Sequence, residues 1–223
     1  MERPRFDGLA TWYDEEIRRL DITSTALNTL ARLLGPGSGR CLDLGCGTGI
    51  AVPDLIKSGW TVVGVDISED QLRVARANTA GPSVEFINAD AANLPFPDGT
   101  YDAVVSMFTH TDFDDYARVL AEVCRVLRPG RRFVYVGTHP CYVTPYVERR
   151  RDGPHRLHPG YRCRGWTKSG PGFGHGIRPR VGVNHSTLGD FLQAIIDSGL
   201  RLRRVEEPGD DDYPILISLV AER

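Results

Sequence analysis

The chain has 223 residues, of which 41% are hydrophobic and 25% are charged, a composition that suits one globular domain with a substantial core. Its formal net charge of −2 gives no electrostatic attraction to nucleic acid or to an anionic membrane surface. No apolar run is long enough to span a bilayer, and the N-terminus lacks the apolar centre of a signal peptide. The five cysteines are an odd number without a disulfide-like spacing, so we expect reduced thiols and a cytoplasmic location.

Residues 1–37 carry two successive helix patterns and are expected to form an N-terminal cap. In the first pattern apolar side chains recur at helical spacing from Phe6 to Leu20, and in the second from Thr23 to Leu34. The glycines and the proline of residues 35–37 end the second helix.

Residues 38–138 alternate between strand and helix patterns. We expect strands at about 40–44, 61–66, 83–88, 101–107 and 132–138, and helices at about 49–58, 69–79 and 114–127. Ser68 and Gln71 have the spacing of a capping box at the start of the second of these helices. Such alternation is typical of an α/β fold with a parallel sheet and helices on both faces.

The composition changes after Thr138. Residues 139–185 are rich in glycine and proline, contain five of the six histidines and show no strong periodicity. A long irregular segment inside a compact domain is usually a functional loop, so we expect a substrate lid here. Residues 186–223 return to regular patterns, with a helix that ends at Gly199 and strands at about 200–206 and 214–221.

A glycine turn directly follows the first predicted strand. Residues 41–50 read Cys-Leu-Asp-Leu-Gly-Cys-Gly-Thr-Gly-Ile, so an apolar strand meets an acid and then three glycines at alternate positions. Glycine allows a tight turn and a close approach between backbone and ligand, as in nucleotide sites. The carboxylate ahead of the glycines would repel a pyrophosphate, and it suits a ligand that carries an ammonium or sulfonium group.

This run resembles motif I of the class I S-adenosylmethionine-dependent methyltransferases, in their small-molecule branch, and the resemblance extends over about residues 38–138. Residues 62–68, 86–91, 94–106 and 126–133 also carry it. It implies a single methyltransferase domain over residues 1–223. The implied fold is Rossmann-like: a seven-stranded, mostly parallel sheet with a C-terminal antiparallel strand, helices on both faces and a lid inserted after strand five.

The resemblance implies S-adenosyl-L-methionine as cofactor and S-adenosyl-L-homocysteine as product. Asp43 would contact the amino end of the cofactor, directly or through the backbone of the glycine turn. Asp66 would accept hydrogen bonds from the ribose hydroxyls, and Asp90 would face adenine. All the predicted cofactor residues lie in the glycine turn or at a strand end: Asp43, Gly45, Gly47, Gly49, Asp66, Ile67, Asp90, Ala91 and Ser106.

The predicted catalytic residues are His110, Tyr13 and His158. His110 follows the fourth strand, and Asp112 lies close enough in sequence to orient its ring, so His110 is the expected general base. The alternative is that His110 is structural and caps the following helix. Tyr13 lies on the N-terminal helix that closes over the cofactor in related methyltransferases, and it suits simple packing equally well.

We expect a small aromatic or heteroaromatic acceptor, methylated at carbon, nitrogen or oxygen, with an indole-like ring as one option. The side chains expected to face it are aromatic or imidazole groups: Trp12, Phe108, His155, Tyr161 and Trp166. A zinc site built from lid histidines and cysteines matches no common ligand spacing, so we expect no metal. We also expect no nucleic-acid or membrane partner and a monomer or homodimer.

Two other functions are compatible with a glycine turn. One is a non-catalytic module that binds S-adenosylmethionine, and the other is a nicotinamide-dependent oxidoreductase. The early Asp43 and the spacing of the glycines argue against the oxidoreductase, because the dinucleotide fingerprint has a different spacing.

Overall fold

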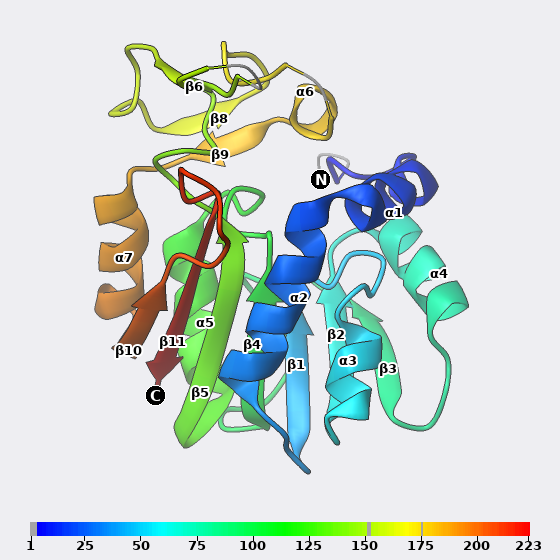
Figure 1. The fold of residues 1–223 in the computed structure, drawn as a ribbon. Coiled ribbons are helices and arrows are strands. Elements are labelled where there is room, and N and C mark those ends of the chain that lie inside the picture. Colours follow the sequence, from blue (N-terminus) through cyan, green and yellow to red (C-terminus); the bar gives the residue numbers. More distant parts are fainter. Residues whose placement is uncertain (1–3, 151–152, 175) are drawn as a thin grey trace.

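The protein is built around a seven-stranded sheet with the strand order β10-β11-β5-β4-β1-β2-β3 (Figure 1). This computed structural model describes residues 4–150, 153–174 and 176–223. The strands are β1 (Arg40–Leu44), β2 (Thr61–Asp66), β3 (Val84–Asn88), β4 (Tyr101–Met107), β5 (Leu127–Thr138), β10 (Arg201–Glu206) and β11 (Leu216–Glu222). Strands β1 to β5 run parallel, and β11 is antiparallel to both β5 and β10, which confirms the predicted fold class.

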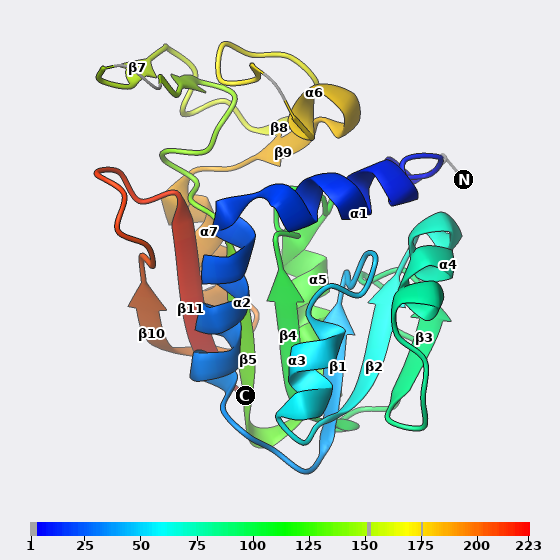
Figure 2. The ribbon, with the colours of Figure 1, turned by 45° about the vertical axis from the view of Figure 1, so that its right-hand side comes forward.

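Helices cover both faces of this sheet, as the alternating pattern predicts (Figure 2). One core joins the sheet to α2 (Asp21–Leu34) and α3 (Val52–Lys57), and the other joins it to α5 (Tyr116–Val126) and α7 (Leu188–Asp197). Alternate residues of each strand face opposite sides, so Cys41 packs in the first core and Leu42 in the second. The remaining long helices are α1 (Ala10–Arg19) and α4 (Glu69–Asn78).

Two element boundaries differ from the sequence prediction by four residues or more. The first helix begins at Ala10, since the chain from Pro4 to Leu9 forms hydrogen-bonded turns instead. Strand β5 begins at Leu127, five residues before the expected start at Arg132, because Tyr101 pairs with Leu127 before the register shifts. Neither difference moves the carboxyl ends of the strands, where the cavity described below lies.

The predicted lid contains more regular structure than its sequence indicates. Residues 139–185 include β6 (Val147–Glu148), β7 (Arg156–Leu157), β8 (Gly165–Thr167), α6 (Arg178–Val181) and β9 (Val183–His185). Strands β6 and β7 pair antiparallel, and so do β8 and β9. These pairs are two or three residues long, which is too short to leave a periodic signal in the sequence. The segment lies above the carboxyl ends of the parallel strands, next to α1 (Figure 2).

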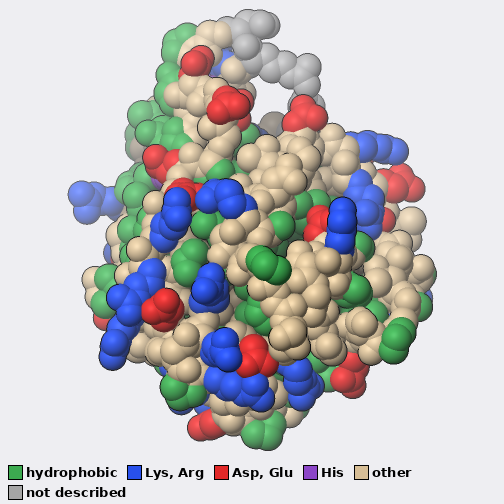
Figure 3. All heavy atoms as spheres, turned by 60° about the horizontal axis from the view of Figure 1, so that its bottom comes forward, with side chains coloured by type: hydrophobic (Ala, Val, Ile, Leu, Met, Phe, Trp, Pro, Cys, Tyr) green, Lys and Arg blue, Asp and Glu red, His purple; other side chains and the backbone are tan. Residues whose placement is uncertain are grey.

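Arginines gather at the opposite end of the sheet, where the parallel strands begin (Figure 3). Asp102 lies among them, accepting from the Arg40 backbone N–H at 3.1 Å and from Arg128 at 2.6 Å. This carboxylate therefore ties the starts of β1, β4 and β5 together. Among the described residues, no helix is both long and apolar enough to cross a bilayer.

Candidate active site

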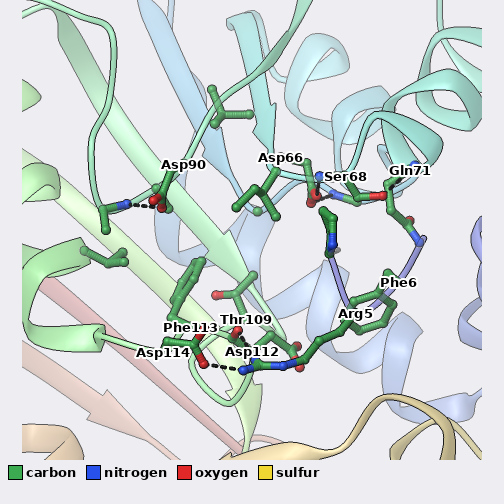
Figure 4. A pocket seen from close by; sticks show the side chains of 18 of the residues that line it. Arg5, Phe6, Asp66, Ser68, Gln71, Asp90, Thr109, Asp112, Phe113 and Asp114 are labelled. Carbon is green, nitrogen blue, oxygen red and sulfur yellow. Dashed lines mark hydrogen bonds and ion pairs between the residues drawn. The ribbon is translucent and has the colours of Figure 1, made fainter. Parts of the chain in front are cut away.

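A cavity of about 790 Å³ opens at the carboxyl ends of β1, β2, β3 and β4. Its walls come from the glycine turn after β1, the ends of β2 and β3, the loop after β4, the N-terminal segment and the lid. Figure 4 shows Asp66 and Ser68 on one side of this space, with Asp112, Phe113 and Asp114 on the other. Ligands of open α/β sheets bind in this position, outside the carboxyl ends of the strands.

The glycine turn adopts a backbone that only glycine takes easily. Gly45, Gly47 and Gly49 have φ angles of 69°, 53° and 77°. A Cβ atom on Gly45 would lie 2.7 Å from Thr109 Cγ2, so a side chain there would collide with the loop after β4. Gly45 and Gly47 line the cavity, whereas Gly49 packs against Ala75 outside it. Gly49 therefore shapes the turn without facing the ligand space.

Asp66 joins this turn to the end of β2. One carboxylate oxygen accepts from the Gly47 N–H and the other from the Ser68 N–H, each at 2.9 Å. The carboxylate still lines the cavity, and each oxygen has a further lone pair available. Burial raises the pKa of Asp66 to about 6. This geometry suits a ligand that presents hydroxyl donors.

Buried polar atoms without a protein partner lie beside the glycine turn. Asp43 Oδ2 and both side-chain amide atoms of Gln71 have none among the described residues. Gln71 lines the main cavity, and Asp43 lines a small adjoining pocket with Gly47 and Tyr13. Burial raises the pKa of Asp43 to about 7, and the nearby Asp66 adds to the effect. Buried polar groups are costly unless they are paired, so these atoms fit a ligand with its own donors and acceptors, such as an amino-acid group.

Three further predicted cofactor residues lie around the far end of the cavity. Asp90 Oδ1 accepts from the Ala92 N–H at 2.8 Å, and Asp90 and Ala91 both line the space. Ile67 is 49% exposed and also lines it, so its apolar surface is available to cover a ring. Together these residues offer a carboxylate oxygen and an apolar surface to a ligand.

Ser106 does not reach the cavity. Its hydroxyl donates to the Leu44 carbonyl at 2.7 Å and contacts Thr109 Oγ1 at 2.6 Å, fully inside the protein. The residues after it line the space instead: Met107, Phe108 and Thr109. Phe108 has a φ angle of 62°, unusual for a residue with a side chain, and its N–H donates to Val136 at 2.9 Å. Strain of this kind is common where a backbone must meet a ligand.

His110 does not line the cavity, and this corrects the expectation that it is the general base. The residue is 5% exposed, and its ring packs against Phe191 and shares a short hydrogen bond with the Tyr135 hydroxyl. Burial lowers the pKa of His110 to about 3, so the ring is neutral near pH 7. The imidazole is therefore part of the core between β5 and α7.

Asp112, expected to orient His110, is paired with Arg178 of the lid instead. The Arg178 guanidinium meets both Asp112 oxygens, and its Nη2 also donates to Thr111 Oγ1 at 2.8 Å. Asp112 lines the cavity. Tyr13 lines it too, and burial raises the pKa of its hydroxyl, so Tyr13 is a hydrogen-bond donor near neutral pH.

The N-terminal segment and the lid meet over the cavity. Arg5 forms an ion pair with Asp114, and its guanidinium lies 5.6 Å from the centre of the Trp166 ring. Phe6 packs edge-on against Tyr13, with ring centres 5.1 Å apart. Aromatic side chains of the N-terminal segment, α1 and the lid thus line the cavity.

Four predicted acceptor or catalytic residues lie outside the cavity. His158 contacts Glu148 at 3.3 Å, and His155 stacks on Tyr213 with ring centres 4.5 Å apart. The Tyr161 hydroxyl accepts from the Leu188 N–H, and Trp12 lies under Arg180. His155, Tyr161 and Trp12 instead link the lid to neighbouring segments, whereas the His158 contact lies within the lid. No group of three or more histidine, cysteine or acidic side chains able to hold a metal occurs in the described ranges.

The sequence interpretation missed several lining residues that lie far apart in the chain: Arg5, Gln71, Phe113 and Arg118. Of these residues, only Gln71 belongs to a recognisable sequence pattern, the capping box predicted with Ser68. Its backbone N–H does donate to Ser68 Oγ at 3.2 Å, but its side chain does not return a hydrogen bond and faces the cavity. When only one of the two hydrogen bonds of a capping box forms, the side chain that makes none is free to face a ligand site.

Comparison with known proteins identifies the family. Residues 41–130 match a methyltransferase domain family. A demethylmenaquinone methyltransferase of Corynebacterium kroppenstedtii is 37% identical over 161 residues, 66% of this chain and 68% of that protein. A crystal structure of an S-adenosylmethionine dependent methyltransferase from Mesorhizobium loti has a TM-score of 0.75 at 27% identity, covering 93% of this chain and 100% of that one. The chain belongs to the S-adenosylmethionine-dependent methyltransferases, and S-adenosylmethionine is the cofactor of this family.

Other relatives match over a shorter stretch. A demethylmenaquinone methyltransferase of Clavibacter sepedonicus is 40% identical over 133 residues, 58% of this chain and 54% of that protein. The chain spans about half the length of the first curated relatives that it matches. A fatty-acid O-methyltransferase of Mycolicibacterium smegmatis is 36% identical over 112 residues. The shared part thus occurs in proteins named for different acceptors.

Proposed function

We propose that the protein transfers the methyl group of S-adenosylmethionine to a small aromatic acceptor that carries an ionisable O–H or N–H. The observation that carries this proposal is the continuity of the cavity. The same cavity has the Gln71 amide atoms without a partner, which suit the cofactor, and the aromatic side chains of Phe6, Tyr13, Phe113 and Trp166 in its walls. Concave, mostly apolar spaces with a few polar groups are typical small-molecule sites.

The chain's own residues would hold the cofactor in an extended arrangement along the strand ends. Asp66 accepts from the ribose hydroxyls, while Asp90 and the Ala91 backbone meet the adenine ring. Asp43 and Gln71 supply the buried polar atoms for the amino-acid end. When bound, the cofactor supplies an electrophilic methyl group on a sulfonium, and the protein's contribution is binding and orientation.

The aromatic walls would orient the acceptor and exclude water. Holding the acceptor atom close to the methyl carbon removes much of the entropic part of the barrier. Charge is neutralised as the methyl group leaves sulfur, so a weakly polar, dry space favours the transition state over the ground state. Trp166 and Arg5 close the mouth and would supply that exclusion.

The quinone-related names of the relatives favour a naphthoquinol or similar phenolic ring as the acceptor. The indole-like acceptor remains a second candidate, because the same aromatic walls suit a flat heterocycle. A fatty acid is less suited, since a long alkyl chain makes little use of four rings and two nearby ion pairs.

A direct test combines binding and turnover. Calorimetry measures the affinity for S-adenosylmethionine, and mass spectrometry then detects methylation in a panel of acceptors. The panel holds 1,4-dihydroxynaphthalene under reducing conditions, indole and dodecanoic acid. We expect tight cofactor binding and methylation of the naphthalenediol. Binding without turnover of any acceptor would favour the non-catalytic module instead.

A further inference from the structure

Three carboxylates that line the cavity take no part in the proposed cofactor contacts, and Asp112 is one of them. Asp112 lies in the loop between β4 and α5, lines the cavity and keeps 22% of its side chain exposed. Each of its oxygens meets a nitrogen of the Arg178 guanidinium. Because a carboxylate oxygen can accept two hydrogen bonds, Asp112 retains acceptor capacity toward the cavity.

Contacts from three segments fix this pair. Arg178 also donates to the Gly182 carbonyl at 3.3 Å, within the lid, and to Thr111 Oγ1 at 2.8 Å, next to Asp112. Arg5, from the N-terminal segment, donates to the Asp112 backbone carbonyl at 2.9 Å. The carboxylate is therefore held in one orientation although it lies in a loop.

The other ionisable groups on this side of the cavity are less suited to take a proton from an acceptor. Asp114 pairs with Arg5 and is 79% exposed at the rim. Asp115 accepts from the Arg118 N–H at 3.0 Å, as the N-cap of α5. The Tyr13 hydroxyl stays protonated near neutral pH, because burial raises its pKa. Among the lining residues that the structure describes, Asp112 is the remaining carboxylate that both faces the cavity and is held by several contacts.

We propose that Asp112 is the general base of the reaction and that Arg178 is the positioning residue that orients it; this rests on the methyl transfer proposed above. The Asp112 carboxylate takes the proton of the acceptor O–H or N–H. The electron pair left on the acceptor, delocalised to a ring carbon where carbon is methylated, forms the new bond to the methyl carbon. The methyl–sulfur bond breaks, and its electron pair stays on sulfur. Asp112 passes the proton to water as the product leaves.

The charges around Asp112 are arranged for this role. Arg178 from α6 and Arg5 from the N-terminal segment face it as cations, and both lower its pKa, while burial raises it overall. Asp66 of β2, Tyr13 of α1 and Tyr135 of β5 are the other titratable groups that sense its charge. Since Arg178 belongs to the lid, the base is complete only while α6 packs against the loop after β4.

The experiment uses the full chain with S-adenosylmethionine and 1,4-dihydroxynaphthalene. In Asp112→Asn the amide can still accept from Arg178 but cannot take a proton, so we expect kcat to fall about 100- to 1000-fold. The Kd for S-adenosylmethionine should stay within about threefold, as Asp112 does not hold the cofactor. Asp112→Glu should recover part of kcat. Asp98→Asn, an exposed carboxylate outside the cavity that pairs with Arg125, is the matched control and should keep full activity.

Two readouts separate a base from a merely structural residue. Wild-type kcat should reach a plateau above the pKa of Asp112, whereas the Asp112→Asn rate should keep rising with pH as the acceptor ionises in solution. Across ring-substituted naphthalenediols of increasing acidity, the ratio of wild-type to variant rate should shrink. Arg178→Gln should shift the acid limb of the wild-type profile to higher pH, because the carboxylate loses its nearest cation.

The outcomes distinguish this inference from the proposed function. Both the proposed function and the assignment of Asp112 as base are supported if the wild type turns over, Asp112→Asn is slow, and the ratio of their rates shrinks as the acceptor becomes more acidic. Wild-type turnover with an equally active Asp112→Asn variant, or a ratio independent of acidity, overturns the base and leaves the proposed function standing. Cofactor binding without wild-type turnover of any acceptor in the panel overturns the proposed function, and the base with it.

Discussion

Asp66 and Gly47 are joined by a hydrogen bond of 2.9 Å from the Gly47 N–H to the Asp66 carboxylate. The two residues end or follow different strands, β2 and β1, that lie side by side in the sheet. The contact makes the acid part of the glycine turn itself. A ligand that bonds to Asp66 therefore bonds to a carboxylate whose position the turn already determines, and little conformational entropy remains to be lost on binding.

Asp66→Asn should weaken S-adenosylmethionine binding roughly 100-fold, because hydrogen bonds from hydroxyls to a charged carboxylate are replaced by weaker ones to an amide. Calorimetry measures this change. Asp54→Asn, an exposed carboxylate at the start of α3, is the control and should bind as the wild type does. Equal affinity in Asp66→Asn and the control would remove Asp66 from the ribose site.

The Asp43 carboxylate is expected to lower the stability of the cofactor-free protein and to strengthen cofactor binding. Its raised pKa, about 7 in the fold against 3.8 for the free side chain, means that folding disfavours the ionised form. The penalty is absent below pH 3.8 and is fully present above about pH 7. Asp43→Asn should therefore raise the stability of the cofactor-free protein at pH 8 by about 1–2 kcal/mol and weaken cofactor binding.

Urea unfolding of both proteins at pH 5 and pH 8, without cofactor, checks this prediction. The stabilising effect of the substitution should be larger at pH 8 than at pH 5. A variant that is less stable than the wild type at both values would show that the Asp43 carboxylate has a partner in the free protein and is not waiting for a ligand.

Most of the cofactor residues predicted from the sequence line one cavity, since they lie in short motifs at strand ends. Asp43 lies in β1 near its carboxyl end, Asp66 ends β2 and Asp90 follows β3, and parallel strands bring their carboxyl ends to one edge. The acceptor half depends on long-range contacts. Arg178 reaches Asp112 across 66 positions, and Arg5 reaches Asp114 across 109, from segments without periodicity.

His110 illustrates a different limit. The sequence places His110 directly after β4, but it does not determine whether the ring faces the cavity or the core. The choice depends on the partner at Tyr135 and on the space beside Phe191, neither of which is local in sequence. Asp112 is only two positions from His110 in the chain, but the two side chains point in different directions. The His110 ring faces the core and the Asp112 carboxylate faces the cavity.

His110→Gln should leave kcat of the folded protein within about threefold of wild type and leave its pH profile unchanged. It should lower stability at pH 7 by about 1–3 kcal/mol, since the ring packing with Phe191 is lost. The contrast with Asp112→Asn separates a core residue from a base. A kcat loss in His110→Gln as large as that in Asp112→Asn, with normal folding by circular dichroism, would restore His110 to the mechanism.

The stability of His110→Gln should depend less on acidic pH than that of the wild type. The His110 pKa is lowered from 6.5 to about 3, so the neutral ring stabilises the fold above pH 6.5, and this contribution is lost as the pH falls toward 3. Glutamine has no proton to gain. The stability difference between His110→Gln and wild type should therefore narrow between pH 6.5 and pH 4, as measured by thermal unfolding at each pH.

Asp102 should show the opposite pH dependence to Asp43, at the other end of the sheet. Hydrogen bonds from Arg128 and the Arg40 N–H lower its pKa, although partial burial opposes them. A lowered pKa stabilises the fold above the unfolded value of 3.8, and the contribution is lost as the pH falls through the folded value. Asp102→Asn should cost about 1–2 kcal/mol at pH 7 and much less near pH 3.

The neighbouring ion pair of Arg125 with exposed Asp98 provides the comparison. Asp98→Asn should change stability by less than about 0.5 kcal/mol at pH 7, because exposed pairs contribute little. Salt should reduce the Asp102 effect only in part, since that side chain is 12% exposed. If the two variants lose equal stability at pH 7, the Asp102 carboxylate does not tie β1, β4 and β5 together, and the arginines around it stabilise the sheet end independently.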